Sequence, residues 1–419
     1  MSQAIGISAV KPVERAIRWY DYISINIYFL GLTTLAQTNG LVTPLLVQQF
    51  VGEEAKGTYL GRLRLWTLMV ALLMQAVWGL LSDRSTLPWG RRRPFILVGT
   101  LANIVCMSLV GFSIGMEGMG GFWFLFTVAI FSQLSSNMGQ SAQQGLIPDL
   151  VPEKKRGLFS GIKAILELPL PLLLVSFTVA NLIKTGNMWG GILLALGVLG
   201  ATMLLAMLAP EKPLKETQPP LDWAPIVRLA VMTAVFSAVI LGMGAGVNLL
   251  GRLLEDVSST TTLVVLMGLA GLAAMCVAVG LGVYASVHIS IGEAARRKPA
   301  FTWWVMNRLA YLVGAVNLST FAVYFIQARL GYEHEKAAGP ASILMMVVGV
   351  FILASALPSG WLADRFVRKP LVAISGVMAA LGTLIALLVP SLTIIYVGGC
   401  LIGVATGLFF ASNWALGTD

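Results

Sequence analysis

The stretch LLSDRSTLPWGRRRPF, residues 80–95, places one aspartate and four arginines between two long apolar segments. A shorter version, WLADRFVRKPL at 361–371, also stands between two apolar segments. The sequence upstream of each is similar as well, since RWYDYISINIYFLG (18–31) aligns with FTWWVMNRLAYLVG (301–314). The repetition predicts that one helical unit occurs twice in the chain.

The composition indicates a membrane protein. Of 419 residues, 57% are hydrophobic and 11% are charged, and the mean hydropathy is +0.83. A soluble domain carries about 25% charged residues. Many apolar runs reach the roughly 20 residues that cross a bilayer as a helix, and they are continuous, which disfavours a barrel of alternating strands. We therefore expect an all-α polytopic membrane protein.

The apolar runs predict twelve transmembrane spans. Lys and Arg gather in alternate loops, which places the N-terminus on the cytoplasmic side of a cell membrane. The net charge of +9 belongs to these loops, so we expect no nucleic-acid partner. Lys56, Arg62 and Arg64 are assigned to the outer side. The expected spans are 22–48, 59–82, 95–116, 121–146, 158–184, 188–209, 225–250, 261–291, 301–328, 339–363, 370–390 and 392–415.

The repeat divides the chain into three parts. Residues 1–209 form a six-helix bundle, 210–300 a linker with two additional spans, and 301–419 the first four helices of a second bundle. SAQQGLIPD (141–149) aligns with ASNWALGTD (411–419), and two further spans follow only the first copy. We therefore expect the second bundle to be truncated at its C-terminal end. The alternative is a complete chain in which the middle pair of spans replaces the last pair.

Two motifs carry a family resemblance. Gly79-Leu-Leu-Ser-Asp-Arg84 followed by Gly90-Arg-Arg-Arg93 resembles the loop motif between spans two and three of the major facilitator superfamily. SDRSTLPWGRRRPFI (82–96), GLVTPLLVQ (40–48) and SNMGQSAQQGLIPDL (136–150) resemble the sucrose-carrier branch of sugar–proton symporters. Where plant sucrose carriers have an intramembrane aspartate and an arginine in the fourth span, this chain has Gln133 and Gln144.

The resemblance implies the fold and a function. The fold would be two helical bundles around a mid-membrane cavity, here with two extra helices between them. The function would be secondary active transport of a small polar solute, a sugar or glycoside, by alternating access in a monomer without a cofactor. Proton coupling is left open. Two alternatives also stay open: a carrier of a non-sugar metabolite or drug, and a non-transporting factor in pigment handling or assembly.

The charged loops are predicted to form a cytoplasmic gate. Arginines at this position bind lipid phosphates, which makes a membrane anchor the simpler alternative. Matched aspartates at the ends of two spans suit a latch, because each can meet an arginine or a helix N-terminus of the neighbouring repeat. The predicted gate residues are Gly79, Asp83, Arg84, Gly90, Arg91, Arg92, Arg93, Asp364 and Arg365.

Polar side chains inside the spans are the candidates for solute binding. Gln133, Asn137 and Gln140 recur at helical spacing on one face of the fourth span, with Gln144 beyond them at the cytoplasmic end. Amides donate and accept hydrogen bonds, which suits hydroxyl-rich ligands, although interhelical bonds are an alternative use. The first span adds Gln37 and Asn39, and the repeat adds Asn317 and Tyr324.

The fifth span holds a charged pair, Lys163 and Glu167, one helical turn apart. Pro169 and Pro171 follow and are expected to disturb the helix. Glu167 is the candidate for proton coupling, and a self-neutralising ion pair is the alternative reading. His288 and His334 have no ligand-like neighbours in the sequence, and no phosphate-binding loop or catalytic constellation is evident, so we expect neither a metal site nor an enzyme.

Overall fold

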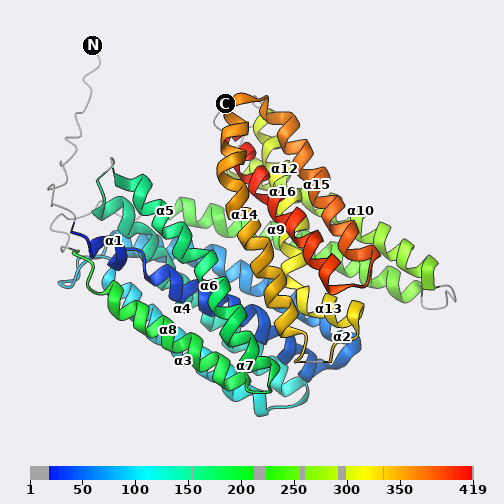
Figure 1. Cartoon of the computed structure of the whole chain (residues 1–419), viewed down its shortest axis with the longest axis horizontal. Coiled ribbons are helices and arrows are strands. Elements are labelled where there is room, and N and C mark those ends of the chain that lie inside the picture. Colours follow the sequence, from blue (N-terminus) through cyan, green and yellow to red (C-terminus); the bar gives the residue numbers. More distant parts are fainter. Residues whose placement is uncertain are drawn as a thin grey trace.

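The computed structural model describes residues 18–152, 155–211, 223–254, 260–290, 299–333 and 335–417, and these residues form helices without strands. Figure 1 shows their arrangement. The helical elements are α1 (Asp21–Ser24), α2 (Tyr28–Asp83), α3 (Arg93–Phe112), η1 (Ser113–Gly115), α4 (Gly118–Leu150), α5 (Arg156–Glu167), α6 (Pro169–Leu174), the π-helical turn η3 (Val175–Val179), α7 (Ala180–Lys184), α8 (Met188–Ala206), α9 (Ala224–Leu253), α10 (Thr260–Ser290), α12 (Pro299–Thr320), α13 (Ala322–Leu330), α14 (Ala338–Arg365), α15 (Arg368–Leu388) and α16 (Leu392–Gly417).

Helix α2 consists of two limbs that join at Gly52. This glycine has φ 78° and ψ 178°, a conformation that residues with a Cβ rarely adopt. The chain reverses there, because both ends of α2 reach the first turns of α3. Tyr28 Oη and Thr100 Oγ1 are 2.6 Å apart, and Arg92 donates a 2.9 Å hydrogen bond to Ser82 Oγ. The two limbs therefore account for the first two predicted spans.

Each of the twelve predicted spans falls on helical structure. Among the described residues, ten helices are long and apolar enough to cross a membrane, the first being the 63-residue run Asp21–Asp83 that includes both limbs of α2. The ninth predicted span is divided into α12 and α13 at Phe321. The disturbance expected at the two prolines is present, since α5 ends at Glu167 and α6 begins at Pro169.

Close contacts between glycines hold the helices together within two groups. A Cβ on Gly99 of α3 would lie 2.7 Å from the backbone nitrogen of Gly139 in α4. A Cβ on Gly382 of α15 would lie 2.8 Å from the carbonyl oxygen of Gly398 in α16. In a bilayer, such close backbone approach supplies the packing that the hydrophobic effect supplies in water. Helices α2–α8 form the first group and α12–α16 the second.

The pair α9 and α10, the two additional spans, packs on itself and contacts one helix of each group. Helix α9 lies against α2, and α10 lies against α12 (Figure 1). The α10–α12 contact buries Val279, Val283 and Val287 against Val305 and Leu309. The division of the chain at 209 and 301 stays a prediction.

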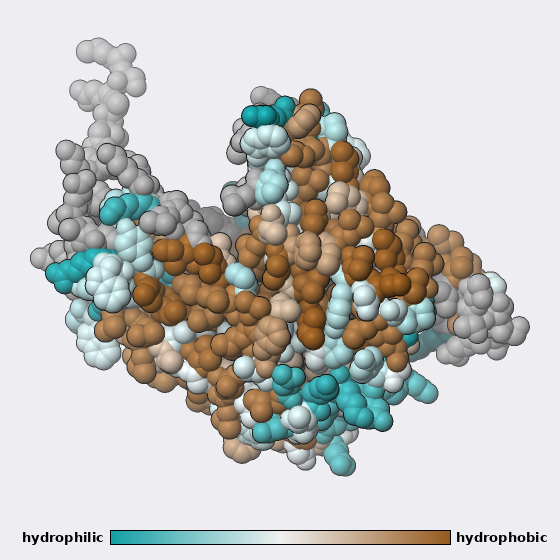
Figure 2. All heavy atoms as spheres, viewed as in Figure 1, coloured by the Kyte–Doolittle hydropathy of each residue, from teal (hydrophilic) through white to brown (hydrophobic). Residues whose placement is uncertain are grey.

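The two groups meet at one end of the molecule, which we name the Gly52 end. A Cβ on Gly186, which follows α7 of the first group, would lie 3.5 Å from Glu335, which precedes α14 of the second. At the same end, Gln49 of α2 donates 2.9 and 3.1 Å hydrogen bonds within the first group, to the carbonyls of Ile114 and Met116. The opposite end, the Arg92 end, holds the start of α3. Figure 2 shows the surface notched there, between the group that contains α5 and the group that contains α14.

Candidate functional site

The seam between the two groups is closed at the Gly52 end by residues of α2 and α13. The hydroxyl of Tyr324 donates a 2.6 Å hydrogen bond to the carbonyl of Pro44. The ammonium group of Lys56 donates a 3.0 Å bond to Gln327 Oε1 and lies 4.8 Å from the centroid of the Tyr324 ring. Lys56 is also ion-paired with Glu53. A desolvated cation over an aromatic ring is worth up to about 2 kcal/mol, so this cluster is a substantial contact.

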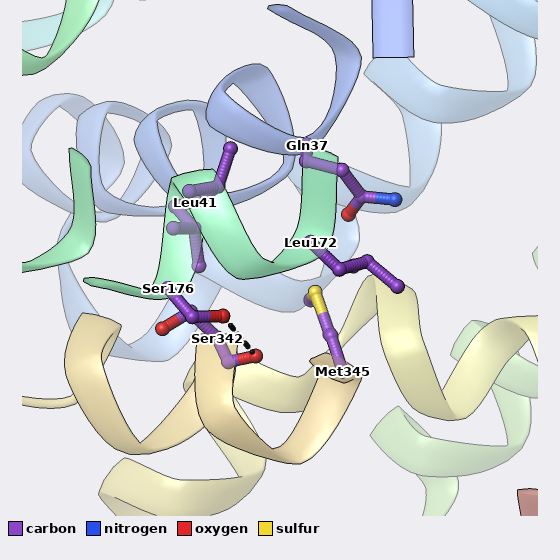
Figure 3. Close-up of a pocket in the computed structure, with 7 residues that line it drawn as sticks. Gln37, Leu41, Leu172, Ser176, Ser342 and Met345 are labelled. Atoms are coloured by element: carbon purple, nitrogen blue, oxygen red, sulfur yellow. Dashed lines mark hydrogen bonds between the residues drawn. The ribbon is translucent and has the colours of Figure 1, made fainter. Parts of the chain in front are cut away.

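A second contact lies beside a small pocket (Figure 3). Ser176 in the π-helical turn η3 donates a 3.0 Å hydrogen bond to the carbonyl of Ser342 in α14. Gln37 of α2 extends into the same space. The residues that line this small pocket are Gln37, Leu41, Leu172, Val175, Ser176, Ser342 and Met345. Gln37 and Ser176 thus line the pocket from two helices of the first group, and Ser176 joins it to a helix of the second.

The predicted amides of α4 are partly satisfied by their neighbours. Asn137 donates to the carbonyl of Gln133 at 2.7 Å and to its side chain at 3.3 Å. Gln144, at the Arg92 end of the stripe, accepts a 3.2 Å bond from Gln75 of α2. Gln140 is half-buried on the same helix. Gln144 thus contacts α2, whereas the hydrogen bonds of Asn137 stay within α4.

The remaining predicted binding residues do not lie together at one site. Asn39 accepts a bond from Thr43 within α2, so it does not share the pocket with Gln37. Tyr324 lies in the seam described above and is 7% exposed. The side chain of Asn317 falls outside what the structure describes.

The charged pair of the fifth span sits at the break in its helix. Lys163 Nζ and Glu167 Oε2 are 3.6 Å apart, and the side chains are 27% and 37% exposed. The ammonium group also lies 4.4 Å from the centroid of the Phe29 ring. Glu167 is the last residue of α5, next to Leu168, where the regular helix stops. The pair is therefore accessible rather than sealed in the core.

At the Arg92 end the predicted gate residues form a compact ion cluster. Arg92, whose side chain is 7% exposed, is ion-paired with Asp83 and with Asp149, the latter at 3.0 Å from its Nε. Arg91 is ion-paired with Asp149 as well. The cluster ties the ends of α2 and α4 to the start of α3, within the first group of helices. Gly90 permits the turn with φ 113°.

Glu211, beyond the end of α8, completes this cluster. Its two carboxylate oxygens accept bonds of 2.7 and 3.0 Å from the backbone nitrogens of Arg92 and Arg93, which cap the N-terminus of α3. Burial raises the pKa of Glu211, against the lowering effect of these hydrogen bonds and of Arg92. Neither Glu211 nor Asp149 was predicted as a gate residue. For Asp149, the alignment of its segment with the second repeat was the sequence signal that could have identified it.

The second copy of the gate is described only in part. Arg365 lies 4.3 Å from the centroid of the Trp361 ring, beyond which α14 ends. The side chain of Asp364 lies outside the described residues, and its predicted role stays a prediction. Gly79 and Arg84 are in place at the end of α2.

Sequence reasoning also missed Arg64. It was counted with the charges of the outer side although it falls within the predicted span 59–82, and the structure places it twelve residues into the second limb of α2. Twelve residues beyond Gly52 correspond to about 18 Å of helix, which is more than halfway across a hydrocarbon core of about 30 Å. The same helix places Lys56 in the seam. Basic residues near a predicted span boundary were therefore counted as loop charges although they lie inside the bundle.

Comparison with known proteins agrees with this architecture. Among solved structures, the chain is similar to the POT family transporter PepTSo (TM-score 0.54, 15% identity, covering 96% of this chain and 88% of that one). It is also similar to a peptide transporter POT in complex with sulfate (0.55, 14%, 94% and 86%) and to a D-xylose–proton symporter (0.53, 15%, 95% and 85%). At these identities the likeness concerns the fold.

The family comparison is more direct. No curated protein matches the chain. The model of the Major Facilitator Superfamily matches residues 28–326, which is well over half of the sequence. This chain belongs to the Major Facilitator Superfamily.

Proposed function

We propose that this protein is a secondary transporter that carries a small polar solute, a sugar or glycoside, by alternating access. The observation that carries the proposal is the asymmetry of the seam. Among the described residues, the hydrogen bonds that join the two helix groups are Tyr324–Pro44, Lys56–Gln327 and Ser176–Ser342, all toward the Gly52 end. The surface is notched at the other end (Figure 2).

This asymmetry corresponds to one of two states. For a solute to pass, the contacts at the Gly52 end must break while the Arg92 end closes. We assign the Gly52 end to the outside and the Arg92 end to the cytoplasm, in agreement with the distribution of Lys and Arg. The solute would enter the cavity while one end is open and leave when the other opens. A monomer in the cell membrane suffices for this cycle.

The solute would be held by amides and hydroxyls that face the cavity. Gln37 already lies in the pocket beside Ser176, and Gln133, Asn137 and Gln140 offer further donors and acceptors on α4. Such groups match the hydroxyls of a sugar, because each amide both donates and accepts. Asn39, Asn317 and Tyr324 would contribute when the seam rearranges.

Glu167 is the proposed proton carrier. Its carboxylate is accessible, stands at a helix break and lies 3.6 Å from Lys163. Broken helices at mid-depth are common at transporter sites. If the ammonium group of Lys163 releases Glu167 on protonation, the state of the pair would follow the proton gradient.

The test is uptake by proteoliposomes that contain the full chain. We expect accumulation of D-glucose or a related hydroxylated solute, and stimulation of that uptake by an inward proton gradient in the wild type but not in Glu167→Gln. If uptake is independent of pH, Glu167 does not couple transport to protons, and the protein transports its solute by facilitated diffusion. An absence of flux, together with co-purification of a pigment or protein partner, would contradict the transport proposal and support a non-transporting factor.

A further inference from the structure

Arg64 lies inside the helix bundle without a counter-ion among the described residues. Its Nε is buried and makes no hydrogen bond with them. An ionised group in the interior of a membrane protein is costly unless a partner meets it, and such groups commonly mark the path of a substrate or an ion. The other basic residue on this helix face, Lys56, is already ion-paired with Glu53.

The position of Arg64 relates it to the seam. Lys56, Leu60 and Arg64 follow one another at intervals of four residues, so they share one face of the second limb of α2. Lys56 on this face contacts Tyr324 and Gln327 of α13, and Arg64 lies two helical turns further along the same face. Arg64 therefore lies below the closed Gly52 end, on the side of the notch.

The glycines near Arg64 leave the helix surface beside it open. Gly57 and Gly61 precede it by seven and three residues on the same side of the helix, and a Cβ on either would meet no heavy atom within 4 Å. The same holds for Gly40, one turn from Gln37 on the facing limb. Arg64 itself is surrounded by protein and yet remains partly accessible. The helix surface on this side of Arg64 is thus free of packed side chains at Gly57 and Gly61.

We propose that Arg64 binds the carboxylate of a hydroxylated, singly charged organic acid, so that the transported solute is a sugar acid. The guanidinium group pairs with a carboxylate through two parallel hydrogen bonds, while Gln37 and the amides of α4 meet the hydroxyls. One unpaired cation neutralises one negative charge, which favours a carboxylate over a phosphate monoester. This inference names the substrate class of the proposed transporter and rests on that proposed function.

The test compares three probes that differ at a single carbon: D-glucuronate, D-glucose and the phosphate monoester of glucose. Binding to the purified full chain is measured as the rise in its thermal unfolding midpoint with ligand concentration. We expect wild-type protein to bind D-glucuronate roughly tenfold or more tightly than D-glucose, as one charge-assisted contact permits. Arg64→Gln is expected to remove this preference, so that D-glucuronate binds no more tightly than D-glucose.

Two further variants keep the test decisive. Arg62→Gln changes an exposed neighbour that lies over the Tyr59 ring, and it is expected to bind like the wild type. Arg64→Lys retains the charge and is expected to keep the preference for D-glucuronate with lower affinity. It replaces Arg64→Gln in the comparison if that variant does not fold. Equal binding of D-glucuronate and D-glucose by the wild type, or preferential binding of the phosphate monoester, overturns the assignment.

The inference and the transport proposal fail in different ways. Arg64-dependent binding of D-glucuronate without flux in proteoliposomes supports the anion site and contradicts transport. If the flux of D-glucose is neither inhibited by D-glucuronate nor changed by Arg64→Gln, transport is supported and the anion site is overturned.

Discussion

Tyr324 of α13 and Pro44 of α2 are 280 positions apart and joined by a 2.6 Å hydrogen bond from the phenolic hydroxyl to the proline carbonyl. The bond links the second helix group to the first limb of the first group. Tyr324 also carries Lys56 over its ring, and Lys56 stands on the second limb. One side chain thus holds both limbs of α2 against the opposite group, and we regard it as the centre of the closed end.

Replacing Tyr324 with phenylalanine is predicted to loosen the Gly52 end. The ring and its contact with Lys56 remain, whereas the hydrogen bond to Pro44 is lost, at a cost of about 1 kcal/mol or roughly a fivefold shift in population. The shift can be measured as the distance distribution between spin labels at Glu54 and Glu333, which are both exposed. We expect a larger population of long distances. An unchanged distribution would show that this bond does not control the closed state.

Gly52→Ala is predicted to destabilise the protein. At φ 78° and ψ 178° a Cβ is strained, and such conformations cost about 1–3 kcal/mol for residues other than glycine. Gly57→Ala is the control, because Gly57 is helical and a Cβ there meets no atom within 4 Å. The thermal unfolding midpoint should fall for Gly52→Ala and stay level or rise for Gly57→Ala. Equal midpoints would mean that the reversal at Gly52 relaxes without cost.

Loss of Arg92 is predicted to destabilise the Arg92 end. Arg92→Gln removes the cation that Asp83 and Asp149 share, so Asp83 loses this ion pair and Asp149 keeps the one with Arg91. Breaking a buried pair costs about 3–5 kcal/mol. Asp83 is 50% exposed and Asp149 25%, so solvent screening reduces the expected loss to roughly 1–2 kcal/mol. A double-mutant cycle with Asp149→Asn measures the coupling. Additive effects of the two changes would contradict the ion pair.

Glu211 is predicted to make stability depend on pH. Burial raises the pKa of this carboxyl in the folded state, so folded protein takes up a proton at a pH where the unfolded chain still does not. Stability of the wild type relative to Glu211→Gln should therefore rise as the pH falls from neutral through the raised pKa, down to the ordinary value near 4.5. Unfolding midpoints of both proteins across this range provide the measurement. A relative loss of wild-type stability on acidification would contradict the burial effect.

The helices were predictable because their cause is local. A run of apolar residues must form its own backbone hydrogen bonds inside a bilayer, so length and hydropathy are enough to place α3, α4 or α15. The break at Pro169 was equally local. The join at Gly52 was not, since the sequence predicted a loop over 49–58 and the structure continues as helix on both sides of a single glycine.

The site was predictable only where one helix supplies all its residues. The amide stripe on α4 follows from helical spacing, and Gln133 and Asn137 do lie together. Glu211 reaches the start of α3 from a segment far along the chain, and no spacing rule connects the two. Arg64 was missed because counting charges by loop treats a cation near a span boundary as exposed. Tyr324 was predicted to contribute to solute binding, and the bond from its hydroxyl to Pro44 depends on packing between groups that are distant in sequence.

The most direct test of alternating access is to lock the seam and measure transport. Ser176→Cys and Ser342→Cys place two thiols at the contact where Ser176 donates to the Ser342 carbonyl at 3.0 Å. Uptake of D-glucuronate and D-glucose by proteoliposomes is measured before cross-linking with a short thiol reagent, after it, and after release of the link. The account predicts that the cross-link stops uptake and that its release restores it. Uptake that continues in cross-linked protein would contradict it.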